Sequence, residues 1–330
     1  MHAESDLTVF DPSRWRGEAV NARMRRRLGD SLRYIIGQAD GHIALPRNEL
    51  DGFFDRLTRG PVSPLVFGAY CDLVLAFNAD DLGTAERLLC EIASAPNVAD
   101  GPRIVDLAEP GTDAAAERYV RLMDSDPDTQ VAISPPGARS GTLRTLIAQA
   151  LALIDTGNPA LGAEIRAIVR EIVLAHGAED AKGLKFDGVS SFMLWGGVVL
   201  NVDGYSTALE LVQALAHESG HNLLFGLSAH GPLQNNDDSE RYPSPLRSDL
   251  RPMDGIVHAT YVTARMHQSI QRLLDAGVLG DEQRQEAQQA NAVNTRHFAA
   301  GMETVDRYAR LTSLGQRVMA GAQDYMRAYA

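Results

Sequence analysis

Two histidines and a glutamate form a His-Glu-x-x-His sequence at positions 217, 218 and 221. Apolar residues from Leu211 to Phe225 recur at helical intervals, which places His217 and His221 one turn apart on one face of a helix. Two imidazoles in that arrangement can bind one divalent ion at about 2 Å from each nitrogen, with Glu218 beside the ion. The motif therefore predicts a metal site. The alternative is an amphipathic core helix in which both histidines only form hydrogen bonds.

A β-strand is expected immediately before this helix. Residues 192–202 are rich in β-branched and aromatic side chains, and Thr207 with Glu210 forms a capping pair for the start of the helix. A strand that leads into a His-Glu-x-x-His helix is typical of zincin-like folds, in which an extended peptide can pair with the strand beside the metal. We therefore expect the strand around Val198 to Val202 to hold a substrate backbone.

The known His-Glu-x-x-His enzymes differ in their third metal ligand, because two histidines rarely hold a catalytic ion alone. The metzincin extension is absent, since Leu224 and Leu227 occupy the positions where it needs glycine and histidine. Thermolysin-like enzymes use a glutamate from the next helix. The only glutamate between His221 and Asp281 is Glu240, which lies in a polar run predicted to be a loop. Neither pattern supplies the third ligand.

His258 is the best candidate for that ligand. It lies in a helical pattern that begins after Pro252 and runs to Met266, and its neighbours are apolar. A buried imidazole without a partner is unfavourable, so ligation would stabilise it there. A core histidine with a hydrogen-bond partner is the alternative. His230 and Asp254 are weaker candidates, the former because it lies among glycine and proline in a predicted loop.

Three arginines lie close in sequence to the predicted third ligand. Arg247 and Arg251 precede the helix that carries His258, and Arg265 lies two turns beyond His258 on almost the same face. Guanidinium groups can bind carboxylates in a bidentate manner, so three of them beside a metal favour an anionic ligand. The alternative is that each arginine pairs with a nearby aspartate and only holds a loop in place.

Three segments together resemble one known family. They are His217 to Phe225, then Tyr242 to Pro252, then Gly255 to His258 with Arg265 following. This combination is similar to that of the HExxH-motif peptide-modification proteins of ribosomal peptide natural-product (RiPP) clusters, a group associated with 2-oxoglutarate-dependent peptide β-hydroxylation. The resemblance covers roughly the C-terminal half of the chain.

The resemblance implies a zincin-like scaffold that performs oxidation. The expected activity is that of a non-heme iron dioxygenase, dependent on Fe(II) and 2-oxoglutarate, which hydroxylates the β-carbon of a side chain in a ribosomally made precursor peptide; zinc is the alternative ion in purified protein. Three protein ligands would leave room on the metal for a bidentate 2-oxo acid and dioxygen. The expected site residues are His217, His221 and His258 for the metal, Arg247, Arg251 and Arg265 for 2-oxoglutarate, and Glu218 for catalysis beside the metal.

Two other functions fit the same residues. In a gluzincin-like zinc metallopeptidase, Glu218 would be the general base for a zinc-bound water, and Tyr261 or an arginine would stabilise the oxyanion. In a peptide-binding module without turnover, the motif histidines would have no catalytic role. Removal of Glu218 and of His217 would separate these two functions, because only the peptidase needs both.

Composition and charge indicate which partners and which cellular location to expect. The chain has 330 residues, 45% of them hydrophobic, and a formal net charge of −12, which argues against nucleic acid as a partner. The basic cluster Arg23 to Arg27 is expected to be the solvated face of the first helix. An acidic start without an apolar run, no membrane-length segment and only two cysteines predict a cytoplasmic protein without a membrane association. Homo-oligomer formation stays open.

The expected fold is mainly α with a small β-sheet, in an α+β arrangement. An N-terminal helical region is predicted for residues 1–133, and a metal-binding catalytic domain with a zincin-like fold for residues 134–330, because acidic and proline-rich stretches lie near that boundary. Gly and Pro breaks separate the predicted helices, which are Pro12 to Gln38, Arg47 to Thr58, Ser63 to Phe77, Gly83 to Ala93, Thr142 to Asp155, Pro159 to His176, Asp281 to Ala300 and Thr304 to Ala328.

Overall fold

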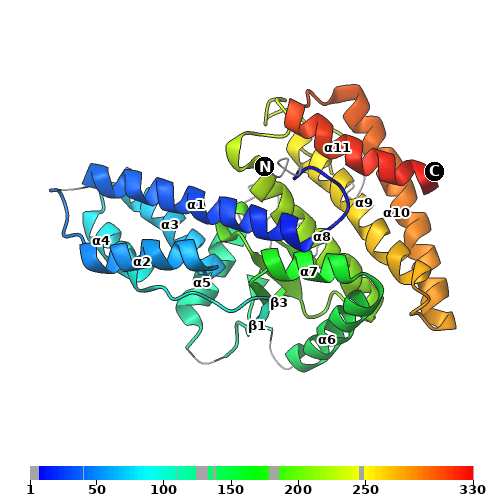
Figure 1. Ribbon diagram of the computed structural model, residues 1–330, viewed down its shortest axis with the longest axis horizontal. Coiled ribbons are helices and arrows are strands. Elements are labelled where there is room, and N and C mark those ends of the chain that lie inside the picture. Colours follow the sequence, from blue (N-terminus) through cyan, green and yellow to red (C-terminus); the bar gives the residue numbers. More distant parts are fainter. Residues whose placement is uncertain are drawn as a thin grey trace, which may run out of the picture. The chain divides into compact units, whose positions relative to one another are not determined.

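Helices dominate the computed structural model, which describes residues 7–39, 41–109, 111–123, 133–136, 139–177, 186–244 and 249–329 (Figure 1). Within these residues, five short strands form one mixed sheet. The expected class, mainly α with a small β-sheet, is confirmed at this level. In this described part of the chain, no helix has the length and apolar character needed to cross a membrane.

The chain divides into two compact units, each built from separated stretches of sequence. The first unit combines Met1–Gly17, Arg144–Ile165 and Tyr205–Ala330, and the second combines Glu18–Leu143 and Arg166–Gly204. The predicted boundary after residue 133 does not coincide with this division. Strand pairing is the reason, because β1 (Arg103–Asp106) lies before that boundary and pairs with β3 (Glu171–Gly177), which lies after it.

The second unit holds the sheet. Its strand order is β1, β3, β5 (Gly197–Asn201), β4 (Gly188–Val189), with β2 (Ile133–Ser134) antiparallel to β3. β1, β3 and β5 run parallel, whereas β4 is antiparallel to β5. Helices make up most of the rest of this unit: α1 (Arg14–Ala39, from Glu18 on), α2 (Arg47–Arg59), α3 (Pro64–Asn78), α4 (Leu82–Ser94) and α5 (Asp113–Met123).

The strand before the motif is an interior strand, which makes the prediction of a substrate-binding strand wrong. All five residues of β5 are buried. Val199 pairs with Val173 of β3 on one side and with Val189 of β4 on the other. A continuous apolar run is typical of a strand buried on both faces of a parallel sheet. Because its backbone is paired on both sides at Val199, β5 cannot accept an extended peptide there.

The first unit is helical and carries the motif. Its helices are α6 (Ser140–Gly157, most of its length), α7 (Pro159–Ile168, most of its length), α8 (Ala208–Leu227), α9 (Met253–Asp275), α10 (Asp281–Tyr308) and α11 (Ser313–Met326). α9 packs against both α8 and α10 (Figure 1). The predicted capping pair is confirmed, since the Thr207 hydroxyl accepts from the Glu210 amide and the Glu210 carboxylate accepts from the Thr207 amide.

Two helix predictions were wrong in extent. The segment predicted as one helix from Pro159 to His176 is a helix only to Ile168 and then becomes β3. Its second part, Glu171 to Gly177, contains apolar residues that fit a buried strand as well as a helix, so periodicity alone does not separate the two. α10 also runs on to Tyr308 through the predicted break, and α11 begins only at Ser313.

Candidate metal centre

α8 brings the two motif histidines together. The Nε2 atoms of His217 and His221 lie 3.0 Å apart, and their ring planes are inclined by 72°. Two nitrogens that each lie about 2 Å from one ion would be separated by about 3 Å, so this pair fits a shared metal ligand site. The His217 side chain is 23% exposed, which leaves the pair within reach of a ligand.

His258 on α9 joins the pair, but from the other side of His221. Its Nδ1 lies 3.2 Å from the Nδ1 of His221, and the two rings are inclined by only 18°. The three imidazoles therefore form a chain rather than three nitrogens around one point. Among the described residues, no three His, Cys, Asp or Glu side chains are arranged to hold an ion as they stand. The structure brings His258 to the motif, and its place as a third ligand stays a prediction.

Proton positions decide what such a chain can do. Every neutral imidazole has one donor nitrogen and one acceptor nitrogen. If the Nδ1–H of His221 donates to Nδ1 of His258 and His217 also carries its proton on Nδ1, the Nε2 lone pairs of His217 and His221 are both free to face a cation. If either Nε2 is protonated instead, the same three rings form an ordinary hydrogen-bonded chain. The residues present thus fit a metal held by the Nε2 pair, with His258 orienting His221 through its other nitrogen.

Burial keeps the three imidazoles neutral, as metal binding requires. It lowers the pKa of His217 to about 4. The pKa of His221 lies well below its usual value because of burial and because His217 and His258 are close. Burial also lowers the pKa of His258, although Asp254, whose Oδ2 lies 4.0 Å from Nε2, opposes the shift. At neutral pH, all three rings therefore have a lone pair to offer.

Met266, which was not predicted as a site residue, contacts His217 of the motif pair. Its Sδ lies 3.3 Å from Nδ1 of His217. A proton on this Nδ1 can be donated to the thioether, a weak acceptor, and the Nε2 of His217 is then left as a lone pair. The signal in the sequence was its spacing, because Met266 lies eight residues after His258, about two helical turns along the same face.

Glu218 is buried beside the pair, with a side chain that is 4% exposed. Its Oε1 lies 3.9 Å from Nε2 of His217, which is beyond hydrogen-bond distance. The carboxylate therefore lies beside the Nε2 of His217, where a ligand of a bound metal would also have to lie. From this position Glu218 could form a hydrogen bond to such a ligand or exchange a proton with it.

The three candidate arginines have different surroundings. Arg247 lies outside the described residues. Arg251 lies just before α9, where its backbone pairs with Tyr242 and its Nη1 lies 3.4 Å from Asp249. Arg265 is 1% exposed and packs against α8, since its Cγ would lie 3.8 Å from a Cβ added at Gly220, the residue before His221.

Arg265 belongs to a buried cluster that the sequence did not reveal. Its Nη2 lies 2.5 Å from Oε1 of Glu164 on α7, and the other oxygen of that carboxylate lies 2.6 Å from the guanidinium of Arg16. Burial alone would raise the pKa of Glu164, but Arg265 and then Arg16 outweigh it and hold the pKa below its usual value. Two buried cations thus share one buried anion, which leaves one positive charge in excess.

The hydrogen bonding of Arg265 is also incomplete. Within the described part of the chain, Nε and Nη1 of Arg265 are buried and have no hydrogen-bond partner. Buried polar groups are nearly always satisfied, and a buried cation without an anion is costly. Nε and Nη1 of Arg265 could therefore donate to a further acceptor, such as an anionic group or a water molecule.

His267 gives a separate test of how burial affects histidine in this unit. It is 2% exposed, its Nδ1 lies 2.9 Å from the Tyr325 hydroxyl, and burial lowers its pKa to about 4. As the pH falls from about 6.5 to 4, the unfolded chain takes up a proton that the folded chain does not, so stability falls. We expect His267 to account for a loss of about 1–2 kcal/mol between pH 7 and pH 5.

The measurement is urea denaturation of the metal-free protein at both pH values, with His267→Gln as the comparison. The variant should lose less stability on acidification than the wild type, whatever its stability at pH 7. An equal loss in both proteins would contradict a neutral, buried His267.

Comparison with known proteins finds no relative of this chain. No family model matches the chain, and no curated protein matches it significantly. The resemblance seen in the His217 to His258 segments therefore carries no support from these comparisons. The function has to be argued from the imidazole chain, from Glu218 and from the buried charge at Arg265.

Proposed function

We propose that this protein is an Fe(II)- and 2-oxoglutarate-dependent oxygenase that hydroxylates the β-carbon of a side chain in a ribosomally made precursor peptide. His217 and His221 would hold the iron. Bound iron and 2-oxoglutarate would supply the activation of dioxygen that hydroxylation needs. The resemblance suggests this chemistry, and the buried charge at Arg265 is the observation that supports it best.

An anionic co-substrate explains that buried charge. Hydrolysis needs a metal-bound water and a polarised carbonyl, and its anion is only the transient oxyanion that forms at that carbonyl. A 2-oxo dicarboxylic acid brings a carboxylate that is remote from its reacting end. Arg265 lies against Gly220, next to His221, and has two nitrogens without a partner among the described residues. Of the three candidate arginines, Arg265 is therefore the one that we propose for the distal carboxylate.

The neighbouring side chains would orient the ligands and control protons. His258 would fix the tautomer of His221 through the Nδ1 contact of 3.2 Å, and Met266 would do the same for His217 through the contact of 3.3 Å. Buried Glu218 would accept a hydrogen bond from a ligand at the metal position. The low exposure of Glu218 and His258 would limit access of water to the reacting atoms.

A zinc peptidase is the second candidate, favoured by one observation. Glu218 is buried and lies 3.9 Å from Nε2 of His217, which is a suitable position for a general base that acts on a metal-bound water. However, α9 contains no glutamate that could serve as the third ligand of a gluzincin. In a peptidase, the buried charge at Arg265 would have a role only if Arg265 is the arginine that stabilises the oxyanion.

Anaerobic titration of the metal-free protein with Fe(II) and then 2-oxoglutarate tests the proposal. We expect a weak visible charge-transfer band on addition of the oxo acid, and at least a tenfold weaker 2-oxoglutarate affinity in Arg265→Met. Arg251→Met serves as the matched control and should keep the wild-type affinity. Bound iron without a band would contradict the oxygenase. Zinc-dependent peptide cleavage that Glu218→Gln abolishes would support the peptidase instead.

The reaction itself is tested by mass spectrometry. A precursor peptide encoded beside the gene would be incubated with the protein, Fe(II), 2-oxoglutarate and air. We expect the peptide to gain one oxygen, with formation of succinate, and fragmentation to place that oxygen on one side chain. A shorter peptide with no added oxygen would instead identify hydrolysis.

A further inference from the structure

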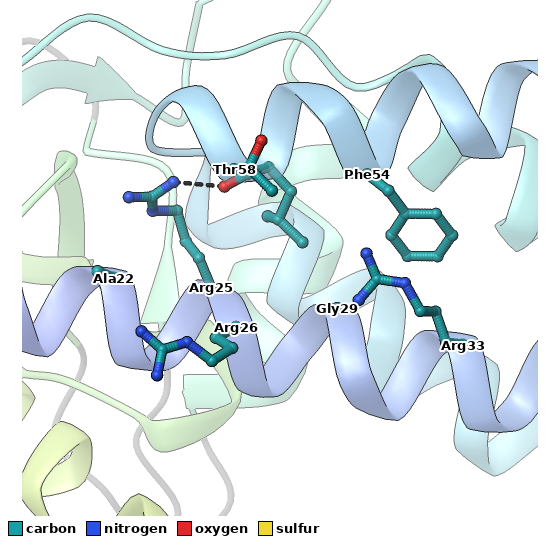
Figure 2. A pocket seen from close by; sticks show the side chains of 8 residues that line it. Ala22, Arg25, Arg26, Gly29, Arg33, Phe54 and Thr58 are labelled. Carbon is teal, nitrogen blue, oxygen red and sulfur yellow. Dashed lines mark hydrogen bonds between the residues drawn. The ribbon is translucent and has the colours of Figure 1, made fainter.

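The second unit contains a basic cleft between α1 and α2. Its volume is about 270 Å³, and Figure 2 shows side chains from the two helices facing each other across it. The α1 side presents Ala22, Arg26, Gly29 and Arg33, which recur every three or four residues and so share one face of the helix. The cleft thus follows from a stripe of small and basic residues opposite a second helix.

Apolar groups from α2 form the floor of this cleft. Phe54 and Leu57 point toward α1, and both line the cleft. Gly29 lets α1 and α2 approach closely at the floor, because a Cβ added there would lie only 3.1 Å from Cδ2 of Leu57. The guanidinium of Arg33 stacks on the Phe54 ring at 4.3 Å (Figure 2), and this cation–π contact holds the charge at one end of the floor.

Two of the three arginines in the cleft retain donors for a ligand. Arg25 is occupied, since its Nη1 donates to the main-chain oxygens of Leu57 and Gly60. Besides its contact with the Phe54 ring, Arg33 has an exposed ion pair with Asp30 at 3.4 Å, which is worth little. Arg26 is exposed and has no carboxylate partner among the described residues. The expectation of a solvated basic face therefore agrees with the exposure of Arg26, and it is Arg25 that departs from it.

The backbone spacing of Arg26 and Arg33 suggests the kind of ligand. Arg26 and Arg33 are seven residues apart, which corresponds to about 10 Å along a helix. In an extended peptide, residues three positions apart are separated by a similar distance of about 10 Å. A cleft of this volume admits a few residues of such a peptide and not a folded domain. Its floor suits an apolar side chain between the two charges.

We propose that this cleft binds an acidic peptide segment in which two carboxylates flank an apolar side chain. The charge of the whole chain is −12, so a basic cleft stands out as a local exception that would attract an anion. Arg26 and Arg33 would each bind one carboxylate, and Phe54 with Leu57 would contact the apolar side chain. The inference goes beyond the proposed function, because neither the motif histidines nor a metal takes part.

The test measures fluorescence anisotropy with the full-length protein in EDTA, so that metal chemistry has no influence. The probe is a fluorescein-labelled peptide of sequence GEELLDELG, and its comparison is GQQLLNQLG, which has the same shape without carboxylates. The variant Arg26→Gln/Arg33→Gln removes both charges. The matched control Arg27→Gln/Arg59→Gln removes two charges from the same helices outside the cleft. Circular dichroism checks that each variant is folded.

We expect the acidic peptide to bind at least tenfold more tightly than the amide peptide. Affinity should fall at least tenfold in Arg26→Gln/Arg33→Gln, a few-fold in Phe54→Leu, and less than twofold in the control variant. Raising the salt concentration should weaken binding. The proposal is overturned if the acidic peptide does not bind, if both double variants bind it equally, or if a single-stranded oligonucleotide of equal charge binds more tightly.

Discussion

Replacing Glu164 with glutamine should lower the free energy of unfolding by about 3–5 kcal/mol. The carboxylate is 1% exposed and lies 2.5 Å from the guanidinium of Arg265 and 2.6 Å from that of Arg16. Glutamine preserves the shape of the side chain but carries no charge, so two buried cations would lose their shared anion. Urea denaturation at pH 7 measures the loss.

Variants at Arg265 provide the control for this expectation. Arg265→Met removes the surplus cation and leaves a matched pair of Arg16 and Glu164, so it should cost less than about 2 kcal/mol. In the double variant Glu164→Gln/Arg265→Met, one buried cation remains instead of two. The double variant should therefore be more stable than Glu164→Gln alone, which is a favourable coupling. A loss below about 1 kcal/mol in Glu164→Gln, or no recovery in the double variant, would show that the cluster carries no excess charge.

The motif helix was predictable because its signals are local. Thr207 and Glu210 lie three residues apart and form the predicted cap, and the spacing of His217 and His221 brings their Nε2 atoms together through helix geometry alone. His258 was predicted to join the two motif histidines by a similar argument, since a buried imidazole in an apolar helix needs a partner. These predictions depended on the 3.6-residue period and on nothing distant in the sequence.

Features that depend on distant pairing were missed. Arg16, Glu164 and Arg265 come from three separated stretches of sequence, and no pattern in one stretch indicates the other two. The interior position of β5 was missed for the same reason, because the partners of a strand lie elsewhere in the chain. The approach of His258 through Nδ1 depends on how α8 and α9 cross, which residue spacing along one helix does not define.

Alanine substitutions of the three histidines should divide them into two classes of metal affinity. His217→Ala and His221→Ala remove an Nε2 ligand, so each should weaken binding by more than 100-fold. His258→Ala should weaken it by about 10- to 100-fold if His258 only orients His221 through Nδ1, as removal of such a partner does in other metal sites. Competition with a chromophoric chelator for Zn(II) measures all three affinities in the absence of turnover.

Met266 and His267 complete the series, since both lie on α9 beside the third histidine. Met266→Leu removes the thioether 3.3 Å from Nδ1 of His217 but keeps the volume of the side chain, so it should weaken Zn(II) binding about tenfold. His267→Gln changes a buried histidine of the same helix that bonds to Tyr325, and it should leave the affinity unchanged.

A loss in His258→Ala as large as that in His217→Ala would instead make His258 a direct ligand. It would mean that the His221 or His258 ring turns on metal binding, because their contact in the structure joins the Nδ1 atoms. Equal, negligible effects of all these substitutions would mean that the three imidazoles form a hydrogen-bonded chain and hold no metal.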